Sequence, residues 1–231
     1  MRFRAPYARP IGRSFCKFAL MIHFRLVSFI FAFCLCAKAA FALSASEAMD
    51  KSKAWFKSAK AWSLDFKLQV FYADSPNMAS QQGSLVVADK DRFKLDIAGI
   101  KFYSDGESLW QHNVEQKQVL IKAVEDLSSS LHPSELLFKY LGCNATAISE
   151  GVFQKQNLWV LKLDPSKYKG QFTQMEVWLS QKDFSPVRLF TVDPEGNGSW
   201  YNITNLKVVK KVSIEDFRYK PIKDVDEIDM R

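Results

Sequence analysis

Residues 92–97 have the sequence RFKLDI, in which the apolar side chains of Phe93, Leu95 and Ile97 alternate with charged ones. A period of two places the apolar side chains on one face of a β-strand and the charged side chains on the other. We therefore expect the sheet that contains this strand to have one apolar face and one face in water.

Most of the chain beyond this strand repeats the alternation. Turn residues such as Asp105-Gly106 and Asp164-Pro165 separate the apolar runs. About a dozen short strands joined by tight turns indicate an antiparallel meander rather than alternating βαβ units. The predicted strands are 64–70, 85–87, 92–97, 101–104, 108–113, 118–122, 146–153, 158–164, 172–180, 186–193, 198–206 and 214–220.

Two segments have helical patterns. The first begins at Ser44, with Glu47 three positions later as in a capping box, and continues through Ala61. The second is 133–141 (PSELLFKYL), which starts with proline and is followed by Gly142. Two short helices cannot cover so large a sheet, so we expect the sheet to curl around its apolar face. The helices would then form a lid over a partly filled interior; a fully packed core is the alternative.

The net charge of +7 does not indicate a nucleic-acid-binding protein. Seven of the 32 basic residues lie in residues 1–42, which contain no acidic residue. The remaining 25 basic residues equal the 25 acidic residues, so residues 43–231 are formally neutral. A protein that neutralises phosphates would keep a basic surface, so no nucleic-acid partner is expected.

The N-terminal segment is typical of a secretory signal peptide. The uncharged apolar stretch Leu26–Ala37 follows Arg25 and leads into Ala40-Phe41-Ala42, which predicts cleavage near Ala42. The stretch is too short to span a bilayer comfortably. An organelle transit peptide is the competing interpretation, which the unbroken apolar core disfavours.

The predicted organisation is a signal peptide over residues 1–42 and a single domain over residues 43–231. Met21 would give a signal peptide of more ordinary length, so we interpret residues 1–20 as sequence upstream of the true translation start. Cys143 is the only cysteine that remains after cleavage, which excludes an intrachain disulfide and disfavours a cysteine metal site. Its expected role is that of a small packed apolar residue.

The domain contains no sequence pattern for catalysis. His112 and His132 lack the spacing of a zinc site, and neither a G-x-S-x-G nor a phosphate-binding loop motif is present. We interpret His112 as a surface residue of a strand. Asp193–Gly198 resembles the start of a calcium loop, but Thr204 stands where the bidentate glutamate belongs, so a hairpin turn is predicted. No enzyme activity, metal or cofactor is expected.

Three motifs stand in order along the domain: Tyr103–Trp110 (YSDGESLW), Pro133–Leu137 (PSELL) and Phe217–Asp226 (FRYKPIKDVD). Together they resemble the periplasmic outer-membrane lipoprotein carrier family, the LolA-type proteins. The most specific is Tyr103–Trp110 (YSDGESLW), which is similar to the family's S-D-G-x-x-L-W. The helix motif P-x-x-L-L matches Pro133–Leu137, and the C-terminal F-x-F-x-P-x-x-x-D-V is similar to Phe217–Asp226. The resemblance covers essentially all of residues 44–231.

This resemblance implies a mainly β fold with a few helices, an unclosed antiparallel β-barrel with a helical lid over an apolar cavity. It implies a soluble, monomeric periplasmic carrier that binds the acyl chains of lipoproteins. Its partners would be acylated lipoproteins, an inner-membrane ABC transporter complex that releases them, and an outer-membrane receptor.

The expected lipid-binding residues combine the apolar alternation with this family fold. They are Phe66, Leu85, Phe93, Leu95, Trp110, Trp178 and Phe190 on the sheet, with Leu136, Leu137 and Leu141 on the lid. Many family members carry Lys-Arg-Pro where this chain has Ala88-Asp89-Lys90-Asp91, and in the family that arginine bonds the lid and gates the cavity. Asp89 occupies its place, so Lys90 and Arg92 are candidates to replace it.

Two other functions fit the sequence. A lipid or lipoprotein sensor of the same fold would need a second interaction domain, for which we see no segment. A periplasmic glycan-binding β-module would use Trp110, Trp178 and Trp200 as stacking platforms, which requires these tryptophans on the outer face of the sheet.

Overall fold

A computed structural model describes residues 43–88, 91–124, 139–168 and 170–231. The signal peptide expected over residues 1–42 therefore lies outside the described residues. The same holds for the first six residues of the helix predicted at 133–141, and for Asp89 and Lys90 of the expected gate.

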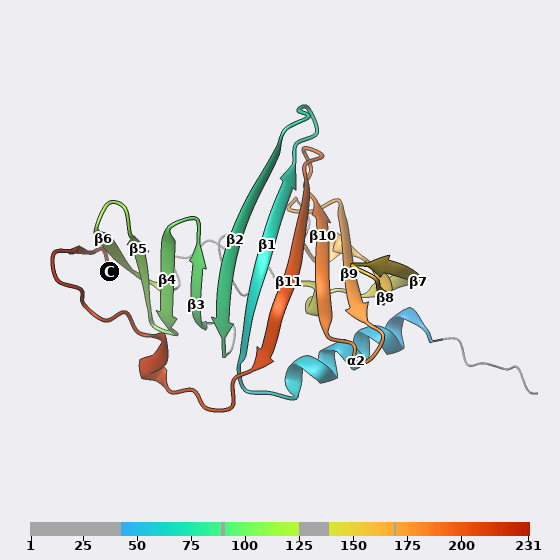
Figure 1. Ribbon diagram of the computed structural model, residues 1–231, viewed down its shortest axis with the longest axis horizontal. Helices are drawn as coiled ribbons and strands as arrows, with labels where there is room; N and C mark the ends of the chain where they lie inside the picture. Colours follow the sequence, from blue (N-terminus) through green and yellow to red (C-terminus); the bar gives the residue numbers. More distant parts are fainter. Residues whose placement is uncertain (1–42, 89–90, 125–138, 169) are drawn as a thin grey trace, which may run out of the picture. The chain divides into compact units, whose positions relative to one another are not determined.

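The described residues form one 12-stranded sheet (Figure 1). Neighbouring strands follow the order β12-β6-β5-β4-β3-β2-β1-β11-β10-β9-β8-β7, and no pairing between β7 and β12 closes the described sheet. The predicted mainly β, unclosed antiparallel fold is confirmed. The strands are β1 (Trp62–Phe71), β2 (Met78–Val87), β3 (Arg92–Ile97), β4 (Ile100–Asp105), β5 (Ser108–Asn113), β6 (Gln118–Ala123), β7 (Ala145–Phe153), β8 (Gln156–Leu163), β9 (Gln174–Ser180), β10 (Pro186–Val192), β11 (Gly198–Val208) and β12 (Asp226–Asp229).

The C-terminal region differs from the prediction. Residues 214–220 do not form a strand, because Ile214–Phe217 fold into the short 3-10 helix η5. The last strand is instead β12, which pairs with β6 in parallel. Its sequence, DEID, lacks the apolar alternation of the other strands, and all four of its residues are exposed.

One α-helix is present in the described residues. Helix α2 (Ala45–Lys57) begins with the predicted capping box, in which Ser44 Oγ accepts from the Glu47 backbone and the Glu47 carboxylate accepts from the Ser44 backbone. The helix ends four residues earlier than expected, since Ser58 caps its C-terminus. It packs against β7, β8 and the 3-10 helix η3 (Lys139–Gly142). A further short helix, η4 (Pro165–Tyr168), follows β8.

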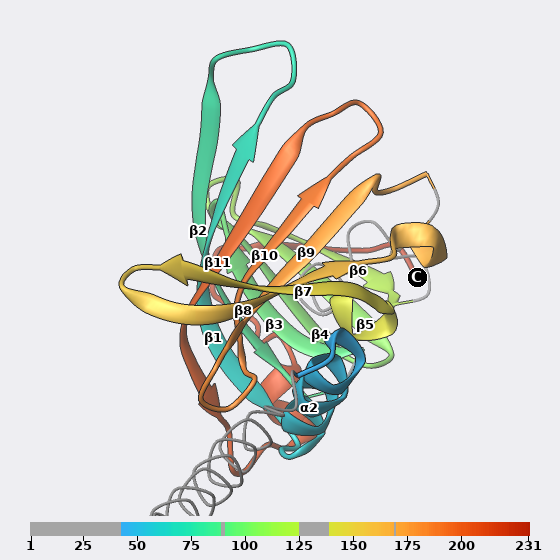
Figure 2. The ribbon, with the colours of Figure 1, turned by 90° about the vertical axis from the view of Figure 1, so that its right-hand side faces the viewer.

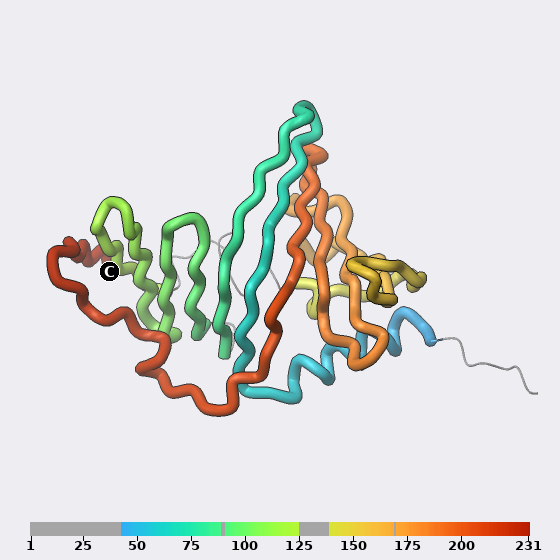
Figure 3. Tube along the Cα trace, in the orientation of Figure 1, coloured from blue at the N-terminus to red at the C-terminus, as the bar shows by residue number. Residues whose placement is uncertain are grey.

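The sheet is strongly twisted. Figure 2 shows that β7 and β8 cross the direction of β1 and β2 at a steep angle. The β1–β2 and β10–β11 hairpins project beyond the shorter β3–β4 hairpin (Figure 3). Only Gly83–Val87 of β2 pair with β3, so the outer half of the β1–β2 hairpin extends past the rest of that side of the sheet.

The two faces of the sheet have different neighbours. The face that carries Phe66, Leu85 and Phe93, here called the inner face, meets α2 and η3 in the main buried cluster. The opposite, outer face of β3–β6 meets the C-terminal segment, where Tyr219 packs with Val119 and Ile121. His112 lies beside this second buried cluster. Its side chain is 5% exposed, and its ring centre lies 5.8 Å from that of Tyr219. The expectation that His112 is a surface residue was wrong, because the C-terminal segment covers it.

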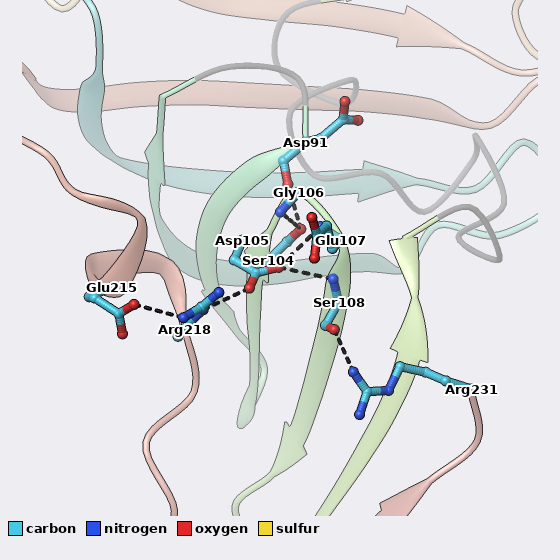
Figure 4. Close-up of polar contacts among 9 residues, drawn as sticks. All are labelled: Asp91, Ser104, Asp105, Gly106, Glu107, Ser108, Glu215, Arg218 and Arg231. Atoms are coloured by element: carbon cyan, nitrogen blue, oxygen red, sulfur yellow. Dashed lines mark hydrogen bonds and ion pairs between the residues drawn. The ribbon is translucent and has the colours of Figure 1, made fainter.

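The S-D-G motif attaches the C-terminal segment to the sheet. Asp105 is 6% exposed, and its Oδ1 accepts from the backbone N–H groups of Glu107 and Ser108. Its Oδ2 accepts from Arg218 Nε at 2.8 Å (Figure 4). Two family-like motifs that are far apart in the sequence thus meet at one carboxylate. On the other side of the turn, Ser104 Oγ donates to the carbonyl of Asp91.

We expect the Asp105→Asn variant to be destabilised by about 1–3 kcal/mol at neutral pH, because the amide cannot accept the charge-assisted bond from Arg218. Burial raises the pKa of Asp105, but the hydrogen bonds from Ser108, Arg218 and Glu107 outweigh it and hold that pKa below its usual value. A carboxylate with a lowered pKa stabilises the fold above the unfolded pKa, and this contribution is lost as the pH falls below about 4. Urea unfolding at neutral and acidic pH measures this difference. An equal loss of stability at both pH values would contradict the prediction.

Candidate functional site: the apolar inner face

Four of the predicted lipid-binding residues lie together on the inner face. Leu85 pairs directly with Leu95 on β3, and Phe66 pairs with Gly83 on β2. A Cβ atom on Gly83 would lie 2.6 Å from the Phe66 ring, so glycine is required for this ring to lie against the sheet. Phe93 is fully buried, and the other three are at most 7% exposed.

The buried cluster is completed by one residue from each of the two predicted helices. Met49 of α2 and Tyr140 of η3 are both at most 2% exposed and belong to the same cluster. The hydroxyls of Ser52 and Tyr140 lie 3.2 Å apart and form a hydrogen bond that joins the two helices. Burial raises the pKa of Tyr140, so this hydroxyl stays neutral. A helix and a 3-10 turn therefore close one part of the inner face.

Further along the inner face, apolar side chains are only partly buried. Leu68 of β1, Ile97 of β3 and Phe102 of β4 pack against the main cluster without being enclosed by it. Leu68 pairs with Tyr201, and Phe102 pairs with Leu95, which places all of them on the same face as the core. The apolar face thus continues beyond the part that the described helices cover.

The predicted lid residues are only partly described. Leu141 is partly buried and packs against the main cluster next to Tyr140. Leu136 and Leu137 lie outside the described residues. Cys143 is buried, and its Sγ atom lies 3.7 Å from the carbonyl oxygen of Lys139. This position fits the expected role of a small packed residue.

Three predicted cavity residues lie on the opposite face. Trp110, Trp178 and Phe190 point outward, because their neighbours Leu109, Val177 and Leu189 occupy the inner positions. Each aromatic residue directly follows an aliphatic one, so alternation alone could not decide which of the two points inward. The prediction that these three residues line the cavity was wrong. Trp110 instead packs on the outer face against the cluster of Val119, Ile121 and Tyr219.

Arg92 also lies away from the inner face. It alternates with Phe93 and pairs with Asp105 at the start of β3, so its side chain leaves the sheet on the outer side. Its Cγ lies 3.5 Å from the position of a Cβ on Gly106. This placement does not suit the gating role for which Arg92 was a candidate, since the expected cavity is on the other face.

A pocket of about 360 Å³ opens beside the inner face near the β10–β11 turn. It is lined by residues that include Tyr201, Phe172 and the buried Lys139. The Lys139 ammonium donates to Gln171 Oε1 at 2.7 Å and lies 5.3 Å from the ring centres of Tyr168 and Phe172. The pocket therefore offers a cation and amide groups next to an apolar surface.

The Asp193–Gly198 segment is the predicted hairpin turn. Asp193 Oδ2 accepts from the side-chain amide of Asn197 at 2.9 Å, and the two backbones also pair across the turn. Within the described part of the chain, no group of His, Cys, Asp and Glu side chains is arranged to hold a metal ion. In the same residues, no helix combines the length and apolar character needed to cross a membrane.

An open sheet with a helix packed on its apolar face defines a half-barrel protein. The family model of the outer membrane lipoprotein carrier protein LolA matches residues 57–220, and the chain belongs to this family. The resemblance inferred from the motifs is thereby confirmed. The members of this family are binding and carrier proteins rather than enzymes.

Three solved structures are similar to this chain at low sequence identity. An uncharacterized conserved protein from Thermus thermophilus has a TM-score of 0.50 and 13% identity, over 79% of this chain and 97% of that chain. LprF from Mycobacterium bovis has a TM-score of 0.48 and 10% identity, over 74% and 95% of the two chains. A LolA superfamily protein from Nitrosomonas europaea has a TM-score of 0.40 and 11% identity, over 77% and 99%. No curated protein matches this chain significantly in sequence.

Proposed function

We propose that this protein is a periplasmic carrier that binds the acyl chains of lipoproteins released from the inner membrane and delivers them to an outer-membrane receptor. The observation that carries the proposal is the continuation of the apolar inner face, at Leu68, Ile97 and Phe102, beyond the part that the described helices enclose. Membership of the lipoprotein carrier family supports it.

The energetics of acyl chains favour a carrier that encloses its cargo only partly. Each buried CH₂ group contributes about 0.8 kcal/mol, so complete burial of several acyl chains would exceed the roughly 20 kcal/mol at which non-covalent affinity saturates. Cargo held that tightly would never be released. An inner face that is buried at one end and partly open at the other suits binding that can be reversed.

The pocket beside the inner face suits the polar end of such a cargo. Acylated lipoproteins carry ester and amide carbonyls where the acyl chains join the polypeptide. Lys139 and Gln171 line the pocket and could donate hydrogen bonds to these carbonyls while the acyl chains lie on the apolar face.

The proposal includes export. The signal peptide over residues 1–42 would deliver the chain to the periplasm, where an ABC transporter complex supplies the energy for lipoprotein release. Transfer to the receptor then needs only a higher affinity of the receptor for the cargo. We propose that the carrier acts as a monomer.

Extraction of a lipoprotein from membranes tests this function. The protein is isolated from periplasm without detergent and mixed with inner-membrane vesicles that contain the transporter, ATP and an acylated lipoprotein. We expect the lipoprotein to become soluble in a complex with the protein, and native mass spectrometry to detect co-purified lipid. A folded protein that extracts no lipoprotein and carries no lipid would contradict the proposal.

The sensor and the glycan-binding module make different predictions in this experiment. A sensor would co-purify with lipid but would not bring the lipoprotein into solution. The tryptophans do lie on the outer face, as the glycan-binding function requires, but Trp110 is partly buried against the cluster that contains Tyr219. The ring of Trp200 is already stacked on Phe190, with 4.5 Å between ring centres, and Arg188 lies over it. These contacts occupy the surfaces on which a sugar would stack.

A further inference from the structure

The two halves of the outer face differ in what covers them. On β3–β6, the C-terminal segment packs over Trp110, Val119 and Ile121. None of the described helices packs on the outer face of β9–β11, because the contacts of α2 and η3 belong to the inner cluster. Yet this second half is also rich in apolar side chains. Its centre is the aromatic–arginine patch, defined here as Phe153, Trp178, Arg188, Phe190 and Trp200.

The patch is built around the guanidinium of Arg188. Its Cζ atom lies 3.5 Å from the ring centre of Trp200, 4.0 Å from that of Phe153 and 5.1 Å from that of Trp178. The register explains the contacts, since Trp178 pairs with Arg188 on adjacent strands. Gly151 leaves room for the Trp178 ring, because a Cβ there would lie 3.0 Å from it. The four aromatic residues and Arg188 are all partly buried, which fixes the guanidinium at the surface.

The charge of Arg188 is not balanced by any described residue. No carboxylate within the described ranges forms an ion pair or hydrogen bond with it, and its Nε atom is buried without an acceptor. Arg188 pairs with Trp178 on β9 and with Asn202 on β11. Trp178 Nε1 and Asn202 Oδ1 are also buried, and neither has a hydrogen-bond partner among the described residues. Burial lowers the pKa of Arg188. A partly desolvated cation held by aromatic rings attracts an anion strongly.

The apolar surface continues towards the tip of the β1–β2 hairpin. Phe71 and Met78 pair with each other there and are 42% and 49% exposed. Phe71 also pairs with Gly198, which in turn pairs with Val192 beside the patch. Aromatic residues and arginine are the residue types that dominate the binding energy of protein interfaces.

We propose that the aromatic–arginine patch is a docking surface for a partner protein that presents a carboxylate on an apolar surface. The guanidinium of Arg188 would bind the carboxylate, and the surrounding rings would bind the apolar side chains next to it. Because the patch lies on the face opposite to the proposed lipid-binding face, a partner can dock while cargo is bound.

Binding of defined peptides tests this proposal. The probes are a short dye-labelled peptide of alternating leucine and glutamate, and a copy with glutamine in place of glutamate; fluorescence anisotropy measures both affinities. We expect the glutamate peptide to bind about tenfold more tightly than the glutamine peptide. The Arg188→Met variant, which keeps an apolar side chain among the rings, should bind both peptides equally.

A matched variant controls for net charge. Lys101→Met removes a basic residue from β4, on the covered half of the outer face, where Lys101 pairs with Asp96 at 3.6 Å. It should keep the preference for glutamate. Thermal unfolding checks that both variants are folded.

Three outcomes would overturn the proposal. The first is equal binding of the two peptides to the unsubstituted protein. The second is binding to phosphatidylglycerol vesicles but not to the glutamate peptide, which would assign the patch to lipid headgroups. The third is self-association that Arg188→Met abolishes in analytical ultracentrifugation, which would assign it to a second copy of the chain. None of these readouts depends on lipoprotein transport, so the carrier function and the docking surface can fail separately.

Discussion

The Leu68→Glu variant should fold but lose most of its binding to an apolar ligand. Leu68 is partly buried on the inner face, next to the buried cluster and opposite Tyr201 on β11. A carboxylate at this position would have to lose its hydration when an acyl chain covers it, which is unfavourable without a partner. We expect the affinity for N-phenyl-1-naphthylamine, an uncharged fluorescent probe, to fall by at least about tenfold.

Two further variants separate the charge from the position. Leu68→Gln introduces a side chain of nearly the same size without the charge, so its affinity should fall less. Gln82→Glu adds the same charge to β2 on the outer face, where Gln82 is exposed and pairs with Lys67. This control should bind the probe as the unsubstituted protein does. Equal losses in Leu68→Glu and Gln82→Glu would contradict the placement of the ligand on the inner face.

The effect of Leu68→Glu should depend on pH. An apolar environment raises the pKa of a glutamate above its ordinary value of about 4.3, because burial disfavours the charged form. Protonation at mildly acidic pH then removes the charge, and binding should partly return as the pH falls. Leu68→Gln should show no such recovery. A pH-independent loss in both variants would mean that shape, not charge, governs the site.

The strands were predictable from the sequence. For some of them, the sequence did not determine which side chains point to the inner face of the sheet and which to the outer face. Where polar and apolar residues alternate strictly, as in Phe93-Lys94-Leu95, the predicted face is the observed one. Where an aliphatic residue precedes an aromatic one, as in Leu109-Trp110 and Val177-Trp178, two opposite assignments satisfy the pattern equally. The expectation that the larger residue points inward was wrong, because the pairing of Trp110 with Tyr103 places Trp110 on the outer face.

Other features depend on contacts between distant parts of the chain. The parallel pairing of β12 with β6 requires the C-terminal segment to cross the outer face of the sheet, which no local pattern encodes. The bond between Asp105 and Arg218 that helps to hold this segment joins residues 113 positions apart in the sequence. Met49 and Tyr140 were parts of predicted helices, but only the fold brings them together in the buried cluster.

The Phe93→Ala variant should lose about 3–5 kcal/mol of unfolding free energy, the largest effect that we expect from a single truncation. Phe93 is fully buried in the main cluster, so the loss of its ring leaves a cavity as well as removing apolar contacts. Urea unfolding monitored by circular dichroism measures the change. Lys94→Ala, on the outer side of the same strand, is the control and should change stability by no more than about 0.5 kcal/mol.

The same variant distinguishes a packed core from a surface that contacts the cargo. If the ring of Phe93 fills space next to the lipid-binding face, an apolar ligand can enter the cavity left by Phe93→Ala and stabilise the folded state in proportion to its concentration. We therefore expect N-phenyl-1-naphthylamine to stabilise Phe93→Ala more than the unsubstituted protein. Equal stabilisation of both proteins would make Phe93 part of a closed core, with the cargo confined to the region of Leu68 and Phe102. A stability loss below about 1 kcal/mol would contradict the buried position of Phe93 itself.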